Sequence, residues 1–206
     1  MKKKETHIYI HAYELLRDQI LSGKIDASVK LTETKLADDL KISRTPVRSA
    51  IAKLEDEGLI KNKHIYVPTE TDIRHIFQVR SILEGYAARY CSEFISDDTL
   101  QKLSKCVDTG FHGNNEEKLQ ANYLFHQLIV EETHNPEIVK IINRMQSIIH
   151  LLRTTVTLHK RPQLVEEHQE ILLAIQSNDG CLAEKLIHKH LEKDLEFSVN
   201  RLPRLE

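Results

Sequence analysis

Apolar residues recur every three or four positions along almost the whole chain, and this spacing is typical of helices that bury one face. Gly, Pro, Asn and Asp interrupt the pattern at intervals, so they mark where one helix ends and the next begins. The pattern predicts two short helices capped by Thr32 and Ser43, and longer helices over residues 7–22, 70–94, 97–108, 115–133, 136–159, 162–177 and 179–200. The fold class is therefore predicted to be mainly α.

The segment LIKNKHIYVP, residues 59–68, alternates apolar and polar residues, and this alternation predicts two short strands. It divides the chain into two predicted domains. Residues 1–68 combine three short helices with this hairpin, and residues 69–206 form an all-helical domain. A chain of 206 residues is long enough for two small domains, each with its own core.

Composition excludes several classes of protein. With 40% hydrophobic and 29% charged residues, the chain is expected to fold in water, and no apolar run approaches the roughly 18 residues that a membrane span needs. The basic N-terminus continues into an amphipathic segment, unlike a secretory signal, and three widely spaced cysteines fit a reducing compartment. A cytoplasmic protein with no membrane partner is expected. Residues 1–67 hold 13 Lys and Arg against 10 Asp and Glu, so an anionic partner suits the first domain.

The segment KISRTPVRSA, residues 41–50, places polar residues at the start of the third predicted helix. Three short helices, a tight turn before the third and a terminal hairpin together describe a winged helix-turn-helix, in which the start of the third helix enters the DNA major groove. Arg44 and Arg48 share a helix face and can bind guanine or phosphate, while Ser43 and Thr45 can bind phosphate oxygens. The alternative is that both arginines are surface residues of a structural helical hairpin.

The run LTETKLADDLKISRTPVRSAIAKLEDEGLI resembles the DNA-binding domain of GntR-type bacterial transcription regulators, and residues 7–61 fit this resemblance. The resemblance implies that Arg44, Thr45 and Arg48 contact double-stranded DNA. It also implies that Thr34 or Lys35 reaches the DNA backbone.

Regulators of this type have a glycine in the wing, the hairpin that follows the recognition helix. The corresponding segment here, KNKHIYV, is short and has none. Contacts from the wing would come from Lys61, Lys63 or His64. We expect a homodimer that places two recognition helices on a pseudo-palindromic operator.

Histidines interrupt the apolar stripes of three helices in the second predicted domain. His126, His168 and His190 each continue such a stripe, whereas His188 falls elsewhere, because residues two apart on a helix are separated by about 200°. Asn122 lies one turn before His126, a spacing that lets two side chains share one ion. A buried imidazole needs a partner, and several that converge in a helical bundle can supply the nitrogen ligands of a divalent metal. Hydrogen-bonded core histidines are the alternative.

Residues 70–200 resemble the all-helical FCD effector domain of the FadR subgroup of GntR regulators. The resemblance rests on the segments VRSILEGYAAR, NYLFHQLIVEETHNP, EEHQEILLAIQSND and AEKLIHKHLEK. Its metal-binding branch implies that Asn122, His126, His168 and His190 are metal ligands. Many members have Asp where this chain has Asn122, and an amide oxygen is a weaker ligand than a carboxylate. Zinc is the expected metal, with nickel and manganese as alternatives.

Arg80 lies on the apolar stripe of the helix predicted over residues 70–94, and a cation there needs an anion. One interpretation is an ion pair with Glu84, one turn further on. The other, which the resemblance favours, is that Arg80 binds the carboxylate of a small organic acid whose remaining oxygens complete the coordination of the metal. Helical phase makes His150 and Arg153 candidates for the lining of the same effector site.

These features together predict a ligand-responsive transcription regulator, expected to act as a repressor, in which an organic acid shifts the dimer between two arrangements. The alternative is a metal-sensing regulator in which the ion itself is the signal. An enzyme is not expected. Three histidines resemble a hydrolytic metal centre, but the sequence has no HExxH motif and places no carboxylate on these stripes as a general base.

Overall fold

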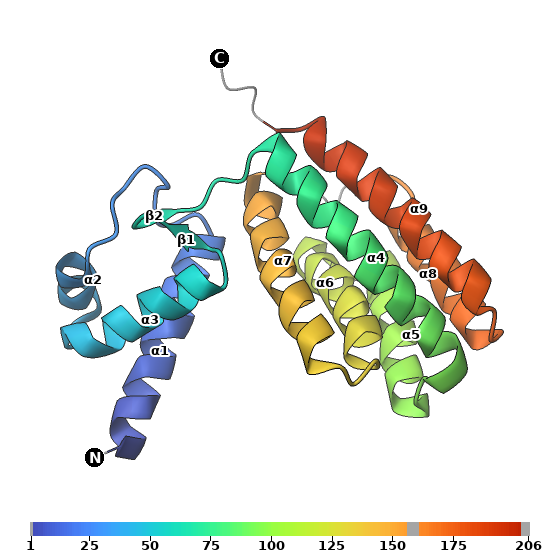
Figure 1. Cartoon of the computed structure of the whole chain (residues 1–206), viewed down its shortest axis with the longest axis horizontal. Coiled ribbons are helices and arrows are strands. Elements are labelled where there is room, and N and C mark those ends of the chain that lie inside the picture. Colours follow the sequence, from blue (N-terminus) through green and yellow to red (C-terminus); the bar gives the residue numbers. More distant parts are fainter. Residues whose placement is uncertain (1, 156–160, 203–206) are drawn as a thin grey trace. The chain divides into compact units, whose positions relative to one another are not determined.

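The computed structural model describes residues 2–155 and 161–202, and this part of the chain is mainly helical, as predicted (Figure 1). Its contacts divide it into two compact units. The first unit ends at Pro68 and the second begins at Thr69, while Ser147–Thr155 groups with the first. None of the helices in the described residues is long and apolar enough to cross a lipid bilayer.

Three helices and a two-stranded hairpin make up most of the first unit. They are α1 (Lys2–Leu21), α2 (Glu33–Leu40), α3 (Arg44–Asp56), β1 (Ile60–Lys61) and β2 (His64–Ile65). Thr32 caps α2 as predicted, because its side chain accepts a hydrogen bond from the backbone of Lys35. Helices α1 and α2 both pack on α3. Their shared apolar core includes Ala12, Leu16, Leu36, Val47, Ala50, Leu54, Leu59 and Ile65. The first unit is thus a winged helix-turn-helix.

Residues with left-handed backbone conformation make the two tight turns of this unit. Lys41, with φ 54°, ends α2 and redirects the chain toward α3. Asn62 (φ 53°) and Lys63 (φ 61°) form the two-residue turn between β1 and β2, where both residues need positive φ. The backbone N–H of Leu31 donates to the carbonyl of Lys63 at 2.7 Å and ties the turn down. The wing therefore forms without a glycine, because Asn tolerates this conformation.

Six helices contribute to the second unit: α4 (Glu70–Phe94), α5 (Asp97–His112), α6 (Asn115–Glu131), α7 (Pro136–Thr155), α8 (Leu164–Gln176) and α9 (Gly180–Val199). Polar side chains fix where several of them begin. Thr69 and Asp72 form a reciprocal capping box at α4, and Asn114 and Glu117 form another at α6. The last residues of the helix predicted over 136–159 lie outside the described part of the chain.

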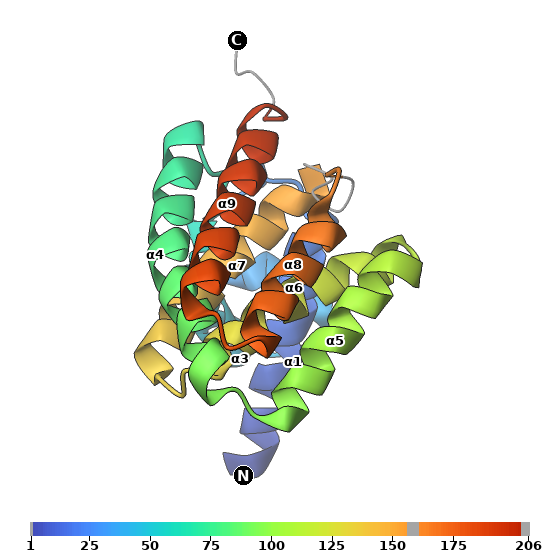
Figure 2. The ribbon, with the colours of Figure 1, turned by 90° about the vertical axis from the view of Figure 1, so that its right-hand side faces the viewer.

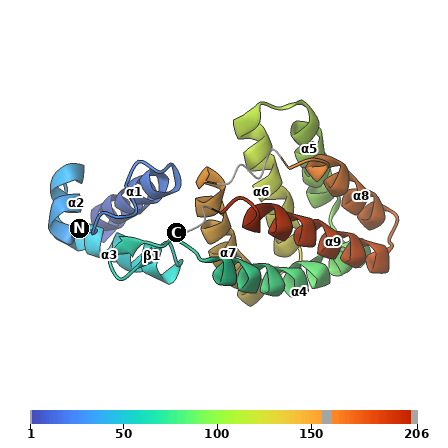
Figure 3. The ribbon, with the colours of Figure 1, turned by 90° about the horizontal axis from the view of Figure 1, so that it is seen from above.

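The helices of the second unit pack around a common interior. Helix α4 packs against α6, α8 and α9, and α5 packs against α6 and α8. Figures 2 and 3 show α9 lying between α4 and α8 from two directions. The buried apolar side chains include Ile73, Phe77, Leu103, Phe125, Ile129, Ile171 and Ile187. The inward faces of α4, α6, α8 and α9 also carry buried polar residues, and these form the candidate site.

The predicted end of the 97–108 helix is wrong. The sequence places a break at Gly110, but α5 continues to His112. A Cβ atom at position 110 would lie 2.8 Å from Cγ1 of Val165 in α8, closer than such atoms approach. Gly110 is therefore needed for close packing of α5 on α8, and not for a turn.

Candidate functional site

The N-terminal end of α3 carries the residues predicted to read DNA. Ser43 occupies the N-cap position in an extended conformation, but its side chain makes no capping hydrogen bond, so the predicted cap by its hydroxyl is wrong. Ser43, Arg44, Thr45 and Arg48 are all exposed. The side chains of the two arginines are 62% and 64% exposed. The opposite face of α3 is anchored in the core by Val47, Ala50 and Leu54. This anchoring fixes the direction of the polar end, which combines two cations with the partial positive charge of a helix N-terminus.

Glu33, the first residue of α2, holds the arginines in place. Each of its carboxylate oxygens accepts a hydrogen bond from Nε of Arg48 at 3.0 Å, and one also accepts from Nη2 at 2.9 Å. Nη2 of Arg44 lies 3.6 Å from the same carboxylate. The hydrogen bond from Arg48 holds the pKa of Glu33 below its usual value. Sequence reasoning missed Glu33, because a contact over 15 positions leaves no periodic signal.

The other residues predicted to contact DNA lie on α2 and the wing. Thr34, Lys35 and Lys63 are exposed, and His64 is half-buried. Nδ1 of His64 lies 2.9 Å from the carbonyl oxygen of Asn62, which fixes the ring beside the turn. The first unit thus offers hydroxyl groups and cations that can bind phosphate or the edges of bases. Their contact with DNA stays a prediction.

Three histidines meet inside the second unit. His126 of α6, His168 of α8 and His190 of α9 are 1%, 3% and 1% exposed. Nε2 of His190 lies 3.2 Å from Nε2 of His126 and 3.2 Å from Nε2 of His168. The ligand atoms of all three lie within 4.8 Å of one another, so one ion can reach them. Phe125 stacks on His168 with ring centroids 4.1 Å apart, which fixes that ring. We call these three residues the histidine cluster.

Two carboxylates orient the rings of the histidine cluster. Oε2 of Glu84 lies 2.7 Å from Nδ1 of His126, and Oε2 of Glu167 lies 2.8 Å from Nδ1 of His190. An ionised carboxylate only accepts hydrogen bonds, so in both rings Nδ1 carries the proton. In a neutral ring Nε2 then carries no proton, and the Nε2 atoms of His126 and His190 lie 3.2 Å apart. Metal-binding histidines are commonly oriented in this way by carboxylates.

Burial and neighbouring charges set the protonation of this region. Burial lowers the pKa of His126 to about 4, although the Glu84 carboxylate opposes this effect. Burial alone would raise the pKa of Glu84, but the positive charge of Arg80 and the contact with His126 bring it to about 2. At neutral pH the imidazole of His126 is therefore uncharged and Glu84 is ionised. A metal ligand and its supporting carboxylate need these states.

Asn122 lies one turn before His126 and is 2% exposed. Neither its Oδ1 nor its Nδ2 has a hydrogen-bond partner among the described residues. A buried amide without partners is unfavourable, and an ion or ligand bound to it would remove that cost. The three imidazoles therefore fit a divalent metal, and the buried amide of Asn122 is compatible with the predicted fourth donor, whose role stays a prediction.

Arg80 is buried and its Nε donates to Oε1 of Glu84 at 2.6 Å, so the ion pair given as the alternative interpretation is present, and the predicted binding of an effector carboxylate by Arg80 stays a prediction. Nη1 of the same guanidinium has no hydrogen-bond partner within the described chain. Glu84 thus connects Arg80 to His126. His150 and Arg153 belong to α7, but their side chains lie outside the described part of the structure, so their predicted role stays a prediction.

Arg161, which sequence reasoning missed, lies on the other side of the histidine cluster. Its Nε donates to Oδ1 of Asp194 at 2.6 Å, and its Nη1 donates to Oε1 of Glu167 at 3.1 Å. Burial would lower the pKa of Arg161, but these two carboxylates raise it, so the guanidinium stays charged. The expectation that no carboxylate lies on the histidine stripes is wrong, because Asp194 follows His190 by one turn on α9 and is 0% exposed. Glu167 directly precedes His168 on α8. Arg161 precedes α8 and had no periodic signal.

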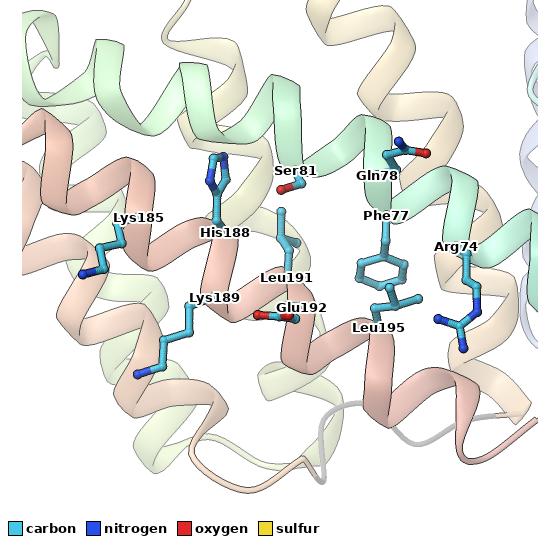
Figure 4. Close-up of a pocket in the computed structure, with 10 residues that line it drawn as sticks. All are labelled: Arg74, Phe77, Gln78, Ser81, Lys185, His188, Lys189, Leu191, Glu192 and Leu195. Carbon is cyan, nitrogen blue, oxygen red and sulfur yellow. The ribbon is translucent and has the colours of Figure 1, made fainter.

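His188 faces away from the cluster, as its helical phase predicts. It lies in a groove of about 450 Å³ between α4 and α9, lined also by Arg74, Phe77, Lys185 and Lys189 (Figure 4). The groove carries a surplus of positive charge, since Glu192 is the one carboxylate among its described lining residues. It is separate from the histidine cluster, whose residues do not line it.

The two units match two known families. Residues 8–64 match the family described as bacterial regulatory proteins, gntR family, and residues 75–193 match the FCD domain. The chain is 26% identical over 205 residues to the HTH-type transcriptional regulator YdhC of Bacillus subtilis (strain 168), covering 94% of this chain and 92% of that protein. It is 27% identical to the gluconate operon transcriptional repressor of Bacillus licheniformis, covering 91% and 83%. McbR/YncC of E. coli has the same fold, with a TM-score of 0.77 at 18% identity over 95% and 99% of the two chains.

Proposed function

The chain belongs to the GntR family of bacterial transcription regulators and carries an FCD domain, and from this we propose a repressor that binds a small organic acid at a metal site. It is a regulator and not an enzyme, as its relatives are. Repressor relatives, such as the gluconate operon repressor, support the proposed sign of regulation. We place its action in the cytoplasm, where its DNA target lies.

The proposed DNA contact is the polar end of α3. Arg44 and Arg48 are exposed, positively charged and directed outward by the buried face of their helix. In a winged helix-turn-helix this end enters the major groove, where arginine can bind two atoms of a guanine. Thr34 and Lys35 on α2 and the wing residues Lys63 and His64 would position the unit on phosphates.

A homodimer is proposed because α4 exposes an apolar stripe. Ile82 is 64% exposed, Tyr86 51% and Phe94 61%, and they follow one another at multiples of four residues. The half-buried Tyr90 fills the gap in the stripe, with its ring centroid 4.8 Å from that of Phe94. Such a stripe is unfavourable in water, and a second copy of the chain would bury it. Two copies would present two recognition helices to a pseudo-palindromic operator.

The histidine cluster carries the proposal of a metal site. Nε2 of His126, whose pKa burial lowers to about 4, is unprotonated at neutral pH and lies 3.2 Å from Nε2 of His190. With the His190 ring in its neutral form and its proton on Nδ1, the two lone pairs would face each other, and a cation bound between them would use both. Zinc is the proposed ion, because it prefers nitrogen ligands and low coordination numbers, and nickel or manganese would also fit imidazole and oxygen donors. A bound ion supplies a Lewis-acidic centre with positions open to an effector oxygen.

The proposed effector is a small carboxylic acid. Arg80 is buried beside the cluster and has one guanidinium nitrogen, Nη1, that lacks a partner among the described residues. A carboxylate there would gain a charge-assisted hydrogen bond. The gluconate operon repressor, one of the similar proteins, is named for an operon of a hydroxy acid, and compounds of that class carry both carboxylate and hydroxyl oxygens.

A metal sensor is the second candidate, because Glu84 already neutralises Arg80 and the three imidazoles suffice for tight binding of an ion. The two candidates respond differently to ligands. Operator binding should be titrated with zinc alone and with zinc plus sugar acids, hydroxy acids and dicarboxylates. Release of DNA by zinc alone supports the sensor, whereas release that also requires an acid supports the effector site. Absence of both responses, with zinc binding undetectable, contradicts both candidates.

A further inference from the structure

Asp194 lies one turn after His190 on α9 and is 0% exposed. Its Oδ1 accepts a hydrogen bond from Nε of Arg161 at 2.6 Å. Its Oδ2 has no hydrogen-bond partner among the described residues and lies 3.6 Å from Nε2 of His190. Oδ1 is therefore held by Arg161, whereas Oδ2 faces Nε2 of His190, the nitrogen that lies 3.2 Å from both other imidazoles.

The spacing is close to that of two ligands of one ion. Zinc lies about 2.1 Å from nitrogen and oxygen ligands, so two ligand atoms of a tetrahedral site are about 3.4 Å apart. The separation of 3.6 Å between Oδ2 and Nε2 of His190 is slightly longer than this distance. Among the described residues, the potential ligand atoms that lie within 4.8 Å of one another belong to the three imidazoles. Oδ2 of Asp194 therefore has to move toward His126 and His168 to complete the site. Rotation about the two side-chain bonds of Asp194 provides that movement.

The charge of the site argues for this ligand. Imidazole ligands, which bind a metal in their neutral form, and the amide of Asn122 would leave a divalent ion without an anionic donor in this buried place, which is costly. The carboxylates of Glu84 and Glu167 are each engaged by Nδ1 of a histidine. Asp194 is the buried carboxylate near the cluster that keeps an oxygen without a hydrogen bond among the described residues.

We infer that Asp194 is the anionic ligand of the metal site, and that it supplies from α9 the carboxylate that the neutral Asn122 cannot supply from α6. This inference rests on the metal site proposed above. Arg161 positions the ligand, because it binds Oδ1 of Asp194 and also binds Glu167, which orients His190. A different role for Asp194 is to neutralise Arg161 and nothing more, and the two roles predict different zinc affinities.

The test uses the full chain and zinc itself, with affinity measured by competition against a coloured chelator. Asp194→Asn keeps the shape of the side chain and an oxygen for Arg161, and we expect it to weaken zinc binding about 100-fold. Asn122→Asp in the same chain should restore most of that affinity, because it returns a carboxylate to the site from α6. A carboxylate that only balances Arg161 would give a loss of less than about threefold, and no rescue.

The single variant Asn122→Asp keeps the inference testable even if Asp194→Asn does not fold. With Asp194 already a ligand, a second carboxylate should tighten zinc binding less than about threefold. A gain of tenfold or more in this variant would overturn the inference, because it would show that the wild-type site lacks an anionic donor. The absorption spectrum of the cobalt-loaded protein should change in Asp194→Asn and stay close to the wild type in Asn122→Asp.

The outcomes for the metal site and for Asp194 can be separated. A wild-type protein that binds no zinc overturns the proposed metal site itself. A wild type that binds zinc with the same affinity as a folded Asp194→Asn variant overturns only the role of Asp194. Circular dichroism and thermal unfolding in the presence of a chelator establish folding independently of the metal.

Discussion

Glu33 and Arg48 are 15 positions apart in the chain, and in the folded first unit the carboxylate binds the guanidinium through both of its oxygens. An acidic residue thus lies within the surface proposed to bind an acidic polymer. It orients Arg48, and it also competes with DNA for it. Glu33 would therefore lower the affinity for DNA of any sequence and raise the specificity for the operator.

Replacing Glu33 by Gln should tighten binding to non-specific duplex several-fold, because an anion beside the phosphates is lost. The ratio of specific to non-specific affinity should fall, because Arg48 loses the contact that orients it. Fluorescence anisotropy on an operator fragment and on a scrambled duplex measures both quantities. The control is Asp39→Asn, which changes an exposed acidic residue of the same helix. Equal changes of the ratio in both variants would contradict a specific role for Glu33.

Arg44→Ala should remove specific operator binding while the second unit stays folded. Loss of one base contact costs about 1–3 kcal/mol, or roughly 5- to 150-fold in affinity, and it relaxes specificity at that base pair. Footprinting on the operator is the measurement. Lys53→Ala removes a cation from the far end of the same helix and should leave the footprint nearly unchanged. A wild-type footprint with Arg44→Ala would contradict the proposed interface.

His168→Ala should abolish the stabilisation of the protein by zinc. A ligand present at one hundred times its Kd stabilises the folded state by about 2.7 kcal/mol, and removing one of three imidazoles raises that Kd steeply. Thermal unfolding of each variant with and without zinc gives the stabilisation due to zinc. The loss of stacking between Phe125 and residue 168 affects both measurements equally and therefore cancels. His188→Ala on α9 should keep the full zinc response, since His188 faces the groove. An unchanged response in His168→Ala would count against the cluster.

Without metal, the free energy of unfolding should decrease as the pH falls, first through His126 and then through Glu84. The pKa of His126 is lowered by burial to about 4 in the folded chain and lies near 6.5 when unfolded, so the unfolded state takes up the proton first as the pH falls. Stability is therefore complete above about pH 6.5 and decreases between there and pH 4. Glu84, whose pKa is about 2 in the fold, adds a further loss below about pH 4.5. Urea unfolding at pH 7.5, 5.5, 4.5 and 3 measures these steps, and His126→Asn should flatten the first.

Tyr86→Glu should convert the proposed homodimer into monomers, because it places a charge in the middle of the apolar stripe on α4. Light scattering coupled to size-exclusion chromatography gives the mass directly. Leu173→Glu, at a residue of α8 that is 56% exposed and outside the stripe, is the control and should leave the mass unchanged. A dimer that persists in Tyr86→Glu would place the interface elsewhere.

Much of the fold could be predicted from the sequence, because helical spacing and caps are local signals. The helix predicted over residues 70–94 begins and ends where α4 does, and Thr32 caps α2. The wing was harder, since its turn uses Asn62 and Lys63 in a conformation for which glycine is the usual marker. The predicted end of α5 was wrong because Gly110 is required for the packing of α5 against Val165 of α8. A contact between two distant helices cannot be recognised in a local sequence pattern.

The histidine cluster was predictable for the same reason that the helices were. His126, His168 and His190 occupy inward positions on three helices, and inward positions of packed helices converge. The groups that orient them came from elsewhere. Arg161, which contacts His190, precedes the first residue of α8. Glu33, which orients Arg48 at the other site, lies on a different helix from its partner. Neither contact follows a helical repeat, so neither could be recognised in the sequence.

The missing side chain at Gly110 has a consequence for the cluster. Its bare backbone sets how closely α5 and α8 approach, through the contact with Val165. Val165 lies one turn before His168 on α8, so even a methyl group at position 110 would displace the helix that carries one of the three imidazoles. Gly110, which has no side chain, thus influences the distance between the imidazoles that are proposed to bind the ion.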